Sequence, residues 1–300
     1  MKAIIQERYG GVEQLFLKNV NIPKYKDNQI LVKMRVANVS SGDAKINTLR
    51  VNPLLRLLLR LVFGFRGPRS KIRGISGVGE VVEVGVKVTR YQKGDVIYFI
   101  NSMKAGCLAE YVVLDESVVS AHKPSMLSDE EAAPLAFGAL SAYHFINAKT
   151  IQKDSRVLIY GASGSLGTYA IQLAKYYGAT VTAVSSKKNH QVLKALGADD
   201  VIDYHTTDFR DDNRVYDVIF DAVMKINKRH CKKVLKPDGR YLSVKMPTKE
   251  SSQRLIEINR MIEEGKLTTY LDHVYMFEAY KEAHERVYSG HKVGNVVIHI

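Results

Sequence analysis

The stretch that decides the fold is Tyr160-Gly161-Ala162-Ser163-Gly164-Ser165-Leu166-Gly167, near the middle of a chain of 300 residues. The residues before it, Arg156–Gly161, have the composition of a buried strand, and Ser165–Tyr177 repeats apolar residues at helical spacing. The glycines follow the G-x-G-x-x-G spacing, with Ala162 in the first position. Small residues between a strand and a helix let a pyrophosphate approach the backbone and the N–H groups of the helix start. We therefore expect these eight residues to form a dinucleotide-binding loop.

Strands and helices alternate around this loop, beginning at the helix-start signal Ser128-Asp129-Glu130-Glu131. The expected strands are Arg156–Gly161, Thr180–Ser185, Val201–Tyr204, Val218–Val223 and Arg240–Val244. The expected helices are Ser165–Tyr177, Asn189–Leu196, Lys228–Leu235 and Gln253–Glu264. Strands that alternate with helices predict a parallel sheet built from β-α-β units. This region therefore has the pattern of a doubly wound α/β domain.

The first part of the chain has a different, mostly β pattern. Short strand-like runs separated by turn residues are expected at Ile30–Val36, Gly79–Val84, Asp95–Ile100 and Glu110–Leu114. Near the end of the chain, a helix at Phe277–Val287 precedes a strand at Val296–Ile300 whose alternation matches this first region. We therefore expect a β-rich domain made of residues 1–122 and 265–300, and an α/β nucleotide-binding domain made of residues 123–264.

The residues after the second strand of the α/β domain indicate which dinucleotide binds. A site that prefers NAD places Asp or Glu there to hold the ribose 2′-hydroxyl. This chain has Ser185-Ser186-Lys187-Lys188 instead. Two hydroxyl and two ammonium groups suit a 2′-phosphate, which an acid would repel. The alternative is that the lysines are a solvated helix start, where cations are mildly unfavourable. We expect NADPH as the cofactor.

Composition restricts the classes to which the chain can belong. Hydrophobic residues make up 46% and charged residues 25%, as in globular proteins, and no apolar run reaches the ~20 residues of a membrane span. The net charge of +13 favours an anionic partner but does not choose among a nucleic acid, an acidic membrane and a phosphorylated dinucleotide. Two cysteines, Cys107 and Cys231, are too few for a disulfide framework or a structural zinc site. Since the N-terminus resembles a strand rather than a signal peptide, we expect a cytoplasmic protein.

Landmarks along almost the whole chain resemble the medium-chain dehydrogenase/reductase superfamily, and within it the zinc-free quinone oxidoreductase-like group. Besides the glycine loop, these landmarks are Tyr9-Gly10-Gly11, Ala37–Asp43, Gly74–Val84, Lys93-Gly94-Asp95, Ala109-Glu110-Tyr111, Glu131–Tyr143, Leu196-Gly197-Ala198-Asp199, Lys236-Pro237-Asp238-Gly239, Glu264-Gly265-Lys266 and Ser289-Gly290-His291. The resemblance implies an α/β protein with a GroES-like β-rich catalytic domain and a Rossmann domain with a doubly wound parallel sheet. It also implies that Ser40 and Ser141 lie beside the nicotinamide, and that Tyr204 helps to hold the 2′-phosphate.

The ligands of zinc-dependent alcohol dehydrogenases in this superfamily are missing from the corresponding segments. The first ligand would fall in Val39–Asp43 and the next near Gly74–Gly77, and neither segment contains Cys or His. Serine hydroxyls are poor zinc ligands, and without a Lewis acid an alkoxide is not stabilised. We therefore expect an NADPH-dependent oxidoreductase that has no metal site and transfers hydride to a quinone, an enone or a related conjugated carbonyl.

No catalytic residue is identified by the sequence. Water, Ser40 and a tyrosine such as Tyr98 are the candidate proton sources. A non-enzymatic NADPH-binding redox sensor or an RNA-binding protein is the alternative function, which the high positive charge supports weakly. The chain lacks an RRM signature, a zinc finger and interleaved aromatic residues, so a nucleic-acid partner is disfavoured.

Residues 44–79 contain no acidic residue and place several Lys and Arg residues among leucines. After Pro53, which suits a helix start, Arg56 and Arg60 share one face at i, i+4 spacing. A broad apolar face is formed by Leu54, Leu57, Leu58 and Leu61. Three interpretations remain open: a lid over the substrate site, a membrane-docking surface, or a helix packed on its own domain.

The end of the α/β domain predicts an unusual sheet edge. Lys245–Ser252 leads directly into the expected helix Gln253–Glu264, which leaves little room for further edge strands. The exposed edge would then carry Lys245, Pro247 and Lys249, and charge and proline discourage strand pairing. We expect a monomer, or a dimer that forms through another surface.

Overall fold

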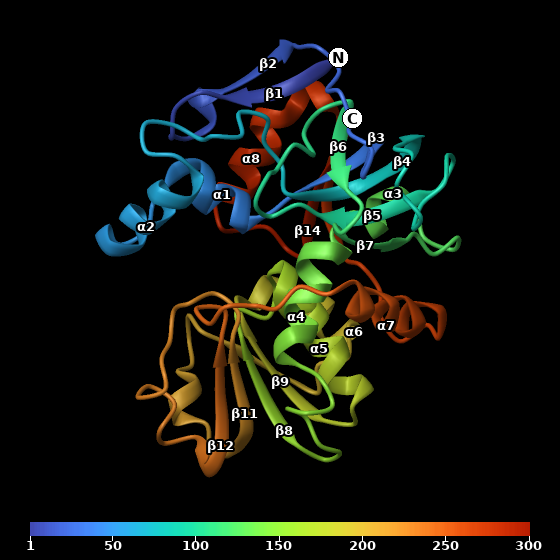
Figure 1. Cartoon of the computed structure of the whole chain (residues 1–300). Helices are drawn as coiled ribbons and strands as arrows, with labels where there is room; N and C mark the ends of the chain where they lie inside the picture. Colours follow the sequence, from blue (N-terminus) through green and yellow to red (C-terminus); the bar gives the residue numbers. More distant parts are fainter. The chain divides into compact units, whose positions relative to one another are not determined.

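The computed structural model describes residues 1–300, which form two compact units. The first unit consists of Met1–Phe137 and Leu271–Ile300, and the second of Gly138–Tyr270 (Figure 1). The first unit extends past residue 122 because helix α3 (Asp129–Ala132) packs on its sheet, and Asp129 forms salt bridges with Arg35 and Lys123. We propose these two units as the limits of the two domains.

The first unit is mostly β-structure. Its strands are β1 (Lys2–Gln6), β2 (Leu15–Asn19), β3 (Gln29–Val39), β4 (Ser76–Val84), β5 (Val96–Ile100), β6 (Tyr111–Asp115), β7 (Val119–His122), β13 (Leu271–Tyr275) and β14 (Asn295–His299). Besides α3, its helices are α1 (Ser41–Thr48), α2 (Pro53–Phe63) and α8 (Tyr280–Tyr288), with 3-10 turns η1 (Val12–Gln14) and η5 (Phe277–Ala279). The four strands expected before residue 120 are all present.

Strand β3 lies at the centre of the main sheet of this unit. The sheet has the order β13-β14-β3-β4-β5-β7, and β6 also pairs with β3. Most of β3 is buried on both faces, including Ile30–Val32 and Val36–Val39, and Lys33 is its one exposed residue, as fits a central strand. The closing strand β14 runs antiparallel to β3, with Val297 opposite Asn38, so the end of the chain completes the sheet begun near its start.

The second unit has a parallel sheet with the order β10-β9-β8-β11-β12. Its strands are β8 (Arg156–Tyr160), β9 (Thr180–Ser185), β10 (Asp200–Asp203), β11 (Tyr216–Asp221) and β12 (Leu235–Ser243). Its helical elements are α4 (Leu140–Phe145), α5 (Ser165–Tyr176), α6 (His190–Ala195), α7 (Ser252–Glu263), η3 (Lys187–Asn189) and η4 (Phe209–Asp211), and the π-helical turn η2 (Leu135–Ala139) crosses the boundary between the units. This order corresponds to the first five strands of a Rossmann sheet, with β8 as the first strand. The expected parallel sheet is confirmed.

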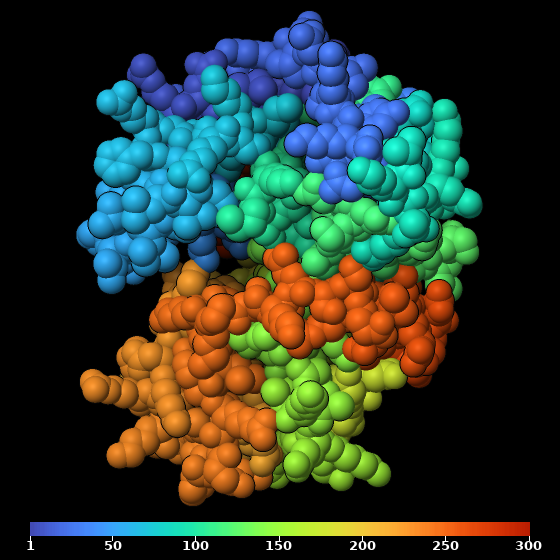
Figure 2. All heavy atoms as spheres, viewed as in Figure 1, coloured from blue at the N-terminus to red at the C-terminus, as the bar shows by residue number.

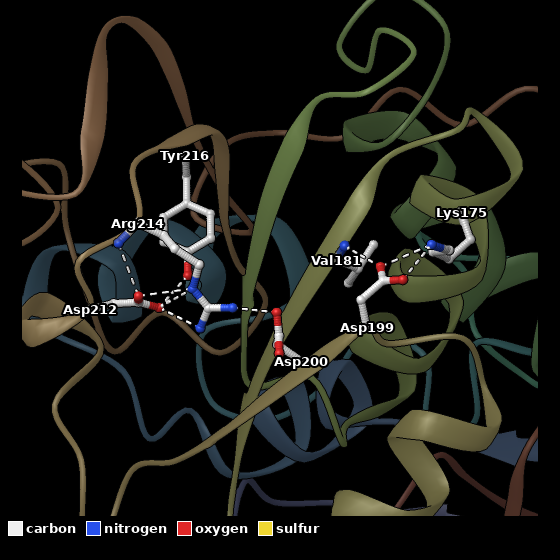
Figure 3. Close-up of polar contacts among 7 residues, drawn as sticks. All are labelled: Lys175, Val181, Asp199, Asp200, Asp212, Arg214 and Tyr216. Atoms are coloured by element: carbon white, nitrogen blue, oxygen red, sulfur yellow. Dashed lines mark hydrogen bonds and ion pairs between the residues drawn. The ribbon is translucent and has the colours of Figure 1, made fainter.

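Two polar clusters hold the start of β10, one of the two outer strands of this sheet (Figure 3). Asp199 accepts hydrogen bonds from Lys175 Nζ at 2.9 Å and from the Val181 N–H at 2.7 Å, which ties the start of β10 to α5 and β9. In the second cluster, Arg214 pairs with both Asp200 and Asp212. These contacts fix the register of β10 and therefore the position of Tyr204, which follows it.

The helix expected at Lys228–Leu235 is not formed. Its residues make i to i−3 hydrogen bonds, such as His230 N–H to the Asn227 carbonyl, and form successive turns. Leu235 already pairs with Tyr216 in the sheet, so this short connection must return to the start of the next parallel strand. Burial of Cys231 within the turns covers the sheet without a regular helix.

The prediction of which residues form the exposed edge of the sheet was wrong. Strand β12 ends at Ser243, so Lys245, Pro247 and Lys249 lie beyond it, in the segment that leads to α7. The edge strand itself contains Lys236-Pro237-Asp238-Gly239, where its register with β11 shifts. The sheet does end after five strands, and its edge is interrupted by a proline and an irregularity, both of which disfavour pairing with another strand.

Candidate functional site

The glycine loop connects β8 to α5 and is attached to the neighbouring strand. Gly161 adopts φ +79°, and the N–H groups of Gly161 and Ala162 both donate to the Val184 carbonyl oxygen at 3.1 Å. Helix α5 begins at Ser165, and its N-cap residue Gly164 has no side chain to cap the first turn. The N–H groups at the start of this helix can therefore receive an anion.

The three glycines of the loop differ in what a Cβ atom would meet. At Gly161 it would lie 2.4 Å from the Val223 side chain, and at Gly167 it would lie 2.5 Å from the Ala162 carbonyl oxygen. The protein's own packing therefore requires both glycines. At Gly164 the nearest atom is the Gly161 carbonyl oxygen at 3.6 Å, and the φ of −75° suits any residue. Nothing in the chain demands a glycine at this position, whereas a pyrophosphate on the loop would. The loop therefore fits a dinucleotide.

The structure brings the expected cofactor residues of three separate stretches to one edge of the sheet. Strand β10 runs parallel to β9 with Asp203 opposite Ser185, and the Tyr204 N–H donates to the Ser185 carbonyl oxygen at 3.3 Å. Since β8, β9 and β10 are parallel neighbours, their carboxyl ends place the glycine loop, the residues that follow Ser185 and Tyr204 together. Ligands of open α/β sheets bind at this edge.

The side chains of Ser185–Lys188 do not all point to one place. The hydroxyl of buried Ser185 donates to the Ser186 carbonyl oxygen at 3.1 Å, while the Ser186 hydroxyl accepts from Asn189 Nδ2 at 3.2 Å. Lys187 and Lys188 are exposed in η3, and the segment contains no carboxylate to pair with them. The two ammonium groups and the Ser186 hydroxyl are therefore the groups of this segment that could hold a phosphate.

A cavity of about 480 Å³ opens beside Tyr204. Its lining consists of Tyr160, Tyr204, His205, Thr206, Thr207, Asp208, Phe209, Arg210, Ile226 and His230. The Tyr204 ring is 48% exposed and lies against the His205 ring, with centroids 4.3 Å apart. Sequence reasoning missed the two histidines and Arg210 because they lie in irregular connections, where only their position after a strand could have indicated them.

Asp221 is another residue that sequence reasoning missed. It ends β11, is wholly buried, and accepts hydrogen bonds from the Val223 N–H at 3.1 Å and the Tyr241 hydroxyl at 3.2 Å. These bonds hold Val223 where it contacts Gly161, so Asp221 orders the loop that faces the glycine loop. A single acid at the end of an apolar strand, Val218–Asp221, was the available signal.

Ser141 lies in the second unit, near the helix that follows the glycine loop. It is half-buried on α4, which packs against α5. One turn earlier, Gly138 approaches α5 so closely that a Cβ would lie 2.5 Å from Ser165 Oγ and 2.8 Å from the Tyr169 ring. Ser141 is thus held near the start of α5 by close helix packing.

Ser40, in the first unit, is the N-cap residue of α1. Its hydroxyl donates to Asp43 Oδ2 at 2.6 Å, and its N–H donates to the same oxygen at 2.9 Å. The Asp43 N–H donates in return to Ser40 Oγ at 3.2 Å, which completes a capping box. Both residues are buried, so the Ser40 hydroxyl is fixed in direction and its proton is directed to a carboxylate.

The segments in which zinc ligands would fall contain hydroxyl and amide groups. Ser76 is buried and its Oγ accepts from Asn38 Nδ2 at 3.2 Å across β3 and β4. No group of three or more His, Cys, Asp or Glu side chains in the chain is arranged to hold a metal ion. Both cysteines are buried, and burial raises the pKa of the Cys231 thiol to about 11 and that of Cys107 well above its usual value. Burial therefore disfavours the reactive thiolate form of both cysteines.

Comparisons with known proteins match both units. A family model described as an alcohol dehydrogenase GroES-like domain matches residues 26–125, and one described as a zinc-binding dehydrogenase matches residues 165–289. The 2-methylene-furan-3-one reductase of Solanum lycopersicum is 31% identical over 323 residues, which cover 100% of this chain and 79% of that protein. The chloroplastic NADPH-dependent alkenal/one oxidoreductase of Arabidopsis thaliana is 29% identical over 320 residues, with the same shares covered.

Solved structures include a similar fold over the full length of the chain. The quinone oxidoreductase from Coxiella burnetii superposes with a TM-score of 0.85 at 27% identity, covering 100% of this chain and 99% of that one. None of the helices described above combines the length and the apolar character needed to cross a membrane.

Proposed function

This chain belongs to the medium-chain dehydrogenase/reductase superfamily and is an oxidoreductase with a nicotinamide cofactor, and from this premise we propose that it uses NADPH to reduce a quinone, an enone or a related conjugated carbonyl without a catalytic zinc. The first unit is its GroES-like domain and the second its Rossmann-like domain. The alternative of a non-enzymatic redox sensor or an RNA-binding protein is set aside, because the relatives are named as reductases and oxidoreductases.

The open position at Gly164 is the observation that carries the cofactor proposal. A bound group accounts for a glycine there, since the protein's own packing leaves room for a side chain. The loop backbone and the start of α5 would hold the pyrophosphate, while Lys187, Lys188 and Tyr204 would hold the 2′-phosphate. The absence of an acid after β9 supports NADPH over NADH. When bound, NADPH supplies a hydride.

The acceptor follows from the groups that the first unit provides. The segments around Ser40 and Ser76 supply hydroxyls that already bond to Asp43 and Asn38, and these are poor partners for zinc. A conjugated carbonyl needs less help than a simple one, because the negative charge that develops is delocalised onto its oxygen. The names of the Solanum lycopersicum and Arabidopsis thaliana relatives, a furanone reductase and an alkenal/one oxidoreductase, fit this class of acceptor.

Of water, Ser40 and Tyr98, we propose water as the proton source. The Ser40 hydroxyl donates to Asp43 at 2.6 Å, and Tyr98 is wholly buried in β5. By the family resemblance, Ser40 and Ser141 would still contact the nicotinamide and orient its ring. No side chain is proposed as the general acid.

The decisive experiment measures oxidation of NADPH and of NADH, by absorbance, against a panel of quinones, enones and simple aldehydes. We expect consumption of NADPH with quinones or enones, slower consumption of NADH, and no reaction with simple aldehydes. Turnover of simple aldehydes that disappears on dialysis against a chelator would refute the zinc-free assignment. Binding of NADPH without turnover of any compound in the panel would refute the proposed acceptor class.

Two further predictions remain proposals. We expect a cytoplasmic location, although the Arabidopsis thaliana relative is chloroplastic. We also expect a monomer, or a dimer formed away from the β12 edge, because Pro237 and the register shift interrupt that strand.

A further inference from the structure

Helix α2 presents its apolar side to solvent. The side chains of Leu54, Leu57, Leu58 and Leu61 are 71%, 49%, 50% and 58% exposed, and they share one face of the helix. Phe65, just after the helix, is 61% exposed. Amphipathic helices on globular proteins normally bury this face, and monomeric proteins rarely expose such patches unless they are used for binding. Helix α2 therefore does not pack its leucine face on its own unit.

The opposite side of α2 rests on the first unit through mixed contacts. Leu59, Arg60 and Phe63 are half-buried. The Nε atom of Arg60 is buried without a hydrogen-bond partner, while its guanidinium lies 5.8 Å from the centre of the Phe65 ring. The helix thus directs one cation inward and its leucines outward, the reverse of the usual arrangement. Covering the leucines with a second apolar phase would remove this apolar area from water and is therefore favourable.

Positive charges surround this apolar face. Residues 44–79 contain no Asp or Glu, and the exposed cations of the segment are Arg50, Arg56, Arg66, Arg69 and Lys71. The guanidinium groups of Arg56 and Arg69 donate to the backbone carbonyls of Val51 and Leu61 rather than to carboxylates. Figure 2 shows this segment as the light-blue atoms that project at the side of the first unit. The surface therefore combines exposed leucines with cations that have no acidic residue within their own segment.

We propose that α2 and the basic residues around it dock the protein on the surface of an anionic lipid bilayer. Leucines that enter the acyl boundary and cations that reach lipid phosphates are the two parts of an interfacial amphipathic helix. With 11 residues, α2 is about 16 Å long, too short to span the roughly 30 Å hydrocarbon core, so it lies in the plane of the interface.

The charges favour lipid over the other partners that could cover the leucines. A second copy of this chain would bring the same cations against each other, and neither copy offers an acid within the segment to compensate. A nucleic acid would match the cations but would leave the leucines exposed to water. This inference goes beyond the proposed function and does not depend on it, because docking involves neither the glycine loop nor a substrate.

Cosedimentation with vesicles tests the proposal, using phosphatidylcholine alone and phosphatidylcholine mixed with phosphatidylglycerol. The first variant, Leu54→Ser/Leu58→Ser/Leu61→Ser, removes the apolar face, and its control Val86→Ser/Met126→Ser/Met246→Ser changes exposed apolar residues elsewhere. The second, Arg50→Gln/Arg56→Gln/Arg66→Gln, removes three charges, and its control Lys228→Gln/Arg229→Gln/Lys232→Gln removes three exposed charges from the second unit. Circular dichroism and melting curves establish that each variant is folded.

We expect the unmodified protein and both controls to bind the anionic vesicles and to be released by salt. Both α2 variants should lose at least about tenfold in affinity. The arginine variant loses attraction to the anionic surface, and the leucine variant loses apolar area that enters the bilayer. No binding to anionic vesicles, or equal binding by the leucine variant, would overturn the proposal. A dimer in light scattering that the leucine variant converts to a monomer would assign the surface to a second copy instead.

Discussion

Replacing Lys187 and Lys188 by alanine is the sharpest test of the cofactor assignment. Both side chains are exposed at the carboxyl end of β9, beside the backbone contact between Ser185 and Tyr204. No residue between Ser185 and Lys188 is acidic, so the double variant breaks no salt bridge within this segment. The change should therefore affect the 2′-phosphate of NADPH and leave the fold intact.

The expected magnitude follows from the exposure of the two ammonium groups. A charge-assisted hydrogen bond contributes up to about 3 kcal/mol when it is shielded from water, and an exposed ion pair contributes about 1 kcal/mol or less. Because a bound phosphate would partly shield both ammonium groups from water, their joint loss should weaken NADPH binding by about 1–3 kcal/mol, which corresponds to roughly 5- to 150-fold in Kd. NADH lacks the 2′-phosphate, so its Kd should change less than about twofold on the same reasoning.

Titration calorimetry with NADPH and NADH provides the measurement, and Lys194→Ala provides the control. Lys194 is an exposed lysine of α6, close in sequence to the site but outside the segment after β9. Ser186→Asp is a complementary variant, because an acid there should repel the 2′-phosphate and favour NADH. Binding of NADPH to the unmodified protein should also weaken as salt concentration rises. Equal losses for both cofactors in the double alanine variant would show that these lysines do not contact a 2′-phosphate.

Four other outcomes test separate parts of the structure. The Gly164→Val variant should fold, because a Cβ at this position meets no atom closer than 3.6 Å. Its side chain should block the pyrophosphate and abolish dinucleotide binding in calorimetry. Normal binding would show that the cofactor lies elsewhere. The purified protein should contain much less than one zinc per chain by elemental analysis, and a chelator should not change its activity; a stoichiometric zinc would contradict this. Burial raises the pKa of Asp212, but hydrogen bonds from Arg214 and Tyr216 outweigh it and lower the pKa to about 2. This stabilisation is complete above the ordinary carboxyl pKa of 3.8 and is lost as pH falls toward 2. Asp212→Asn should therefore lower the free energy of unfolding in urea by about 1–2 kcal/mol at pH 7 and by much less near pH 2. A loss that does not change with pH would refute the assignment. Light scattering should give a monomer, or a dimer whose mass is unchanged by deletion of Pro237 and Asp238 from the β12 edge.

The glycine loop could be predicted from sequence because its signal is local. Strand, turn and helix follow one another within Arg156–Tyr176, and the spacing of small residues has a direct geometrical meaning. The cations after β9 were also visible, since they follow the next strand directly. Here the expected boundaries agree with the observed elements to within one residue, because packing reinforces what the sequence pattern already favours.

Features that depend on pairing between distant segments could not be predicted in the same way. The charged run Lys228–Leu235 has helical spacing, but Leu235 is drawn into the sheet opposite Tyr216, and the connection is too constrained to form a regular helix. The role of Asp221 depends on Tyr241, which belongs to a different strand, and on a loop whose course the sequence does not reveal. In each case tertiary contacts decide a local conformation that propensity alone leaves undetermined.

Helix α2 shows a different limit of sequence-based prediction. The sequence identified the helix and its apolar face but not the direction in which that face points. Periodicity identifies which residues share a face, but it does not say whether that face turns toward the protein or away from it. The half-buried Arg60 and the exposed Leu54 settle this question only in the structure. A pattern that is typical of burial can therefore belong to a surface that requires a partner.

The net charge of +13 does not indicate which anion binds where. The residues that surround each group of cations do favour one anion over another. Lys187 and Lys188 lie at the same sheet edge as the Ser186 hydroxyl, Tyr204 and the uncapped start of α5, all of which can donate hydrogen bonds to a phosphate. The exposed arginines of residues 44–79 lie beside leucines, which contribute nothing to phosphate binding in water but bury favourably in lipid. Salt should therefore weaken both NADPH binding and vesicle binding, whereas loss of the α2 leucines should weaken only vesicle binding. If the leucine variant lost NADPH affinity as strongly as vesicle affinity while remaining folded, the two basic surfaces would not be separate sites.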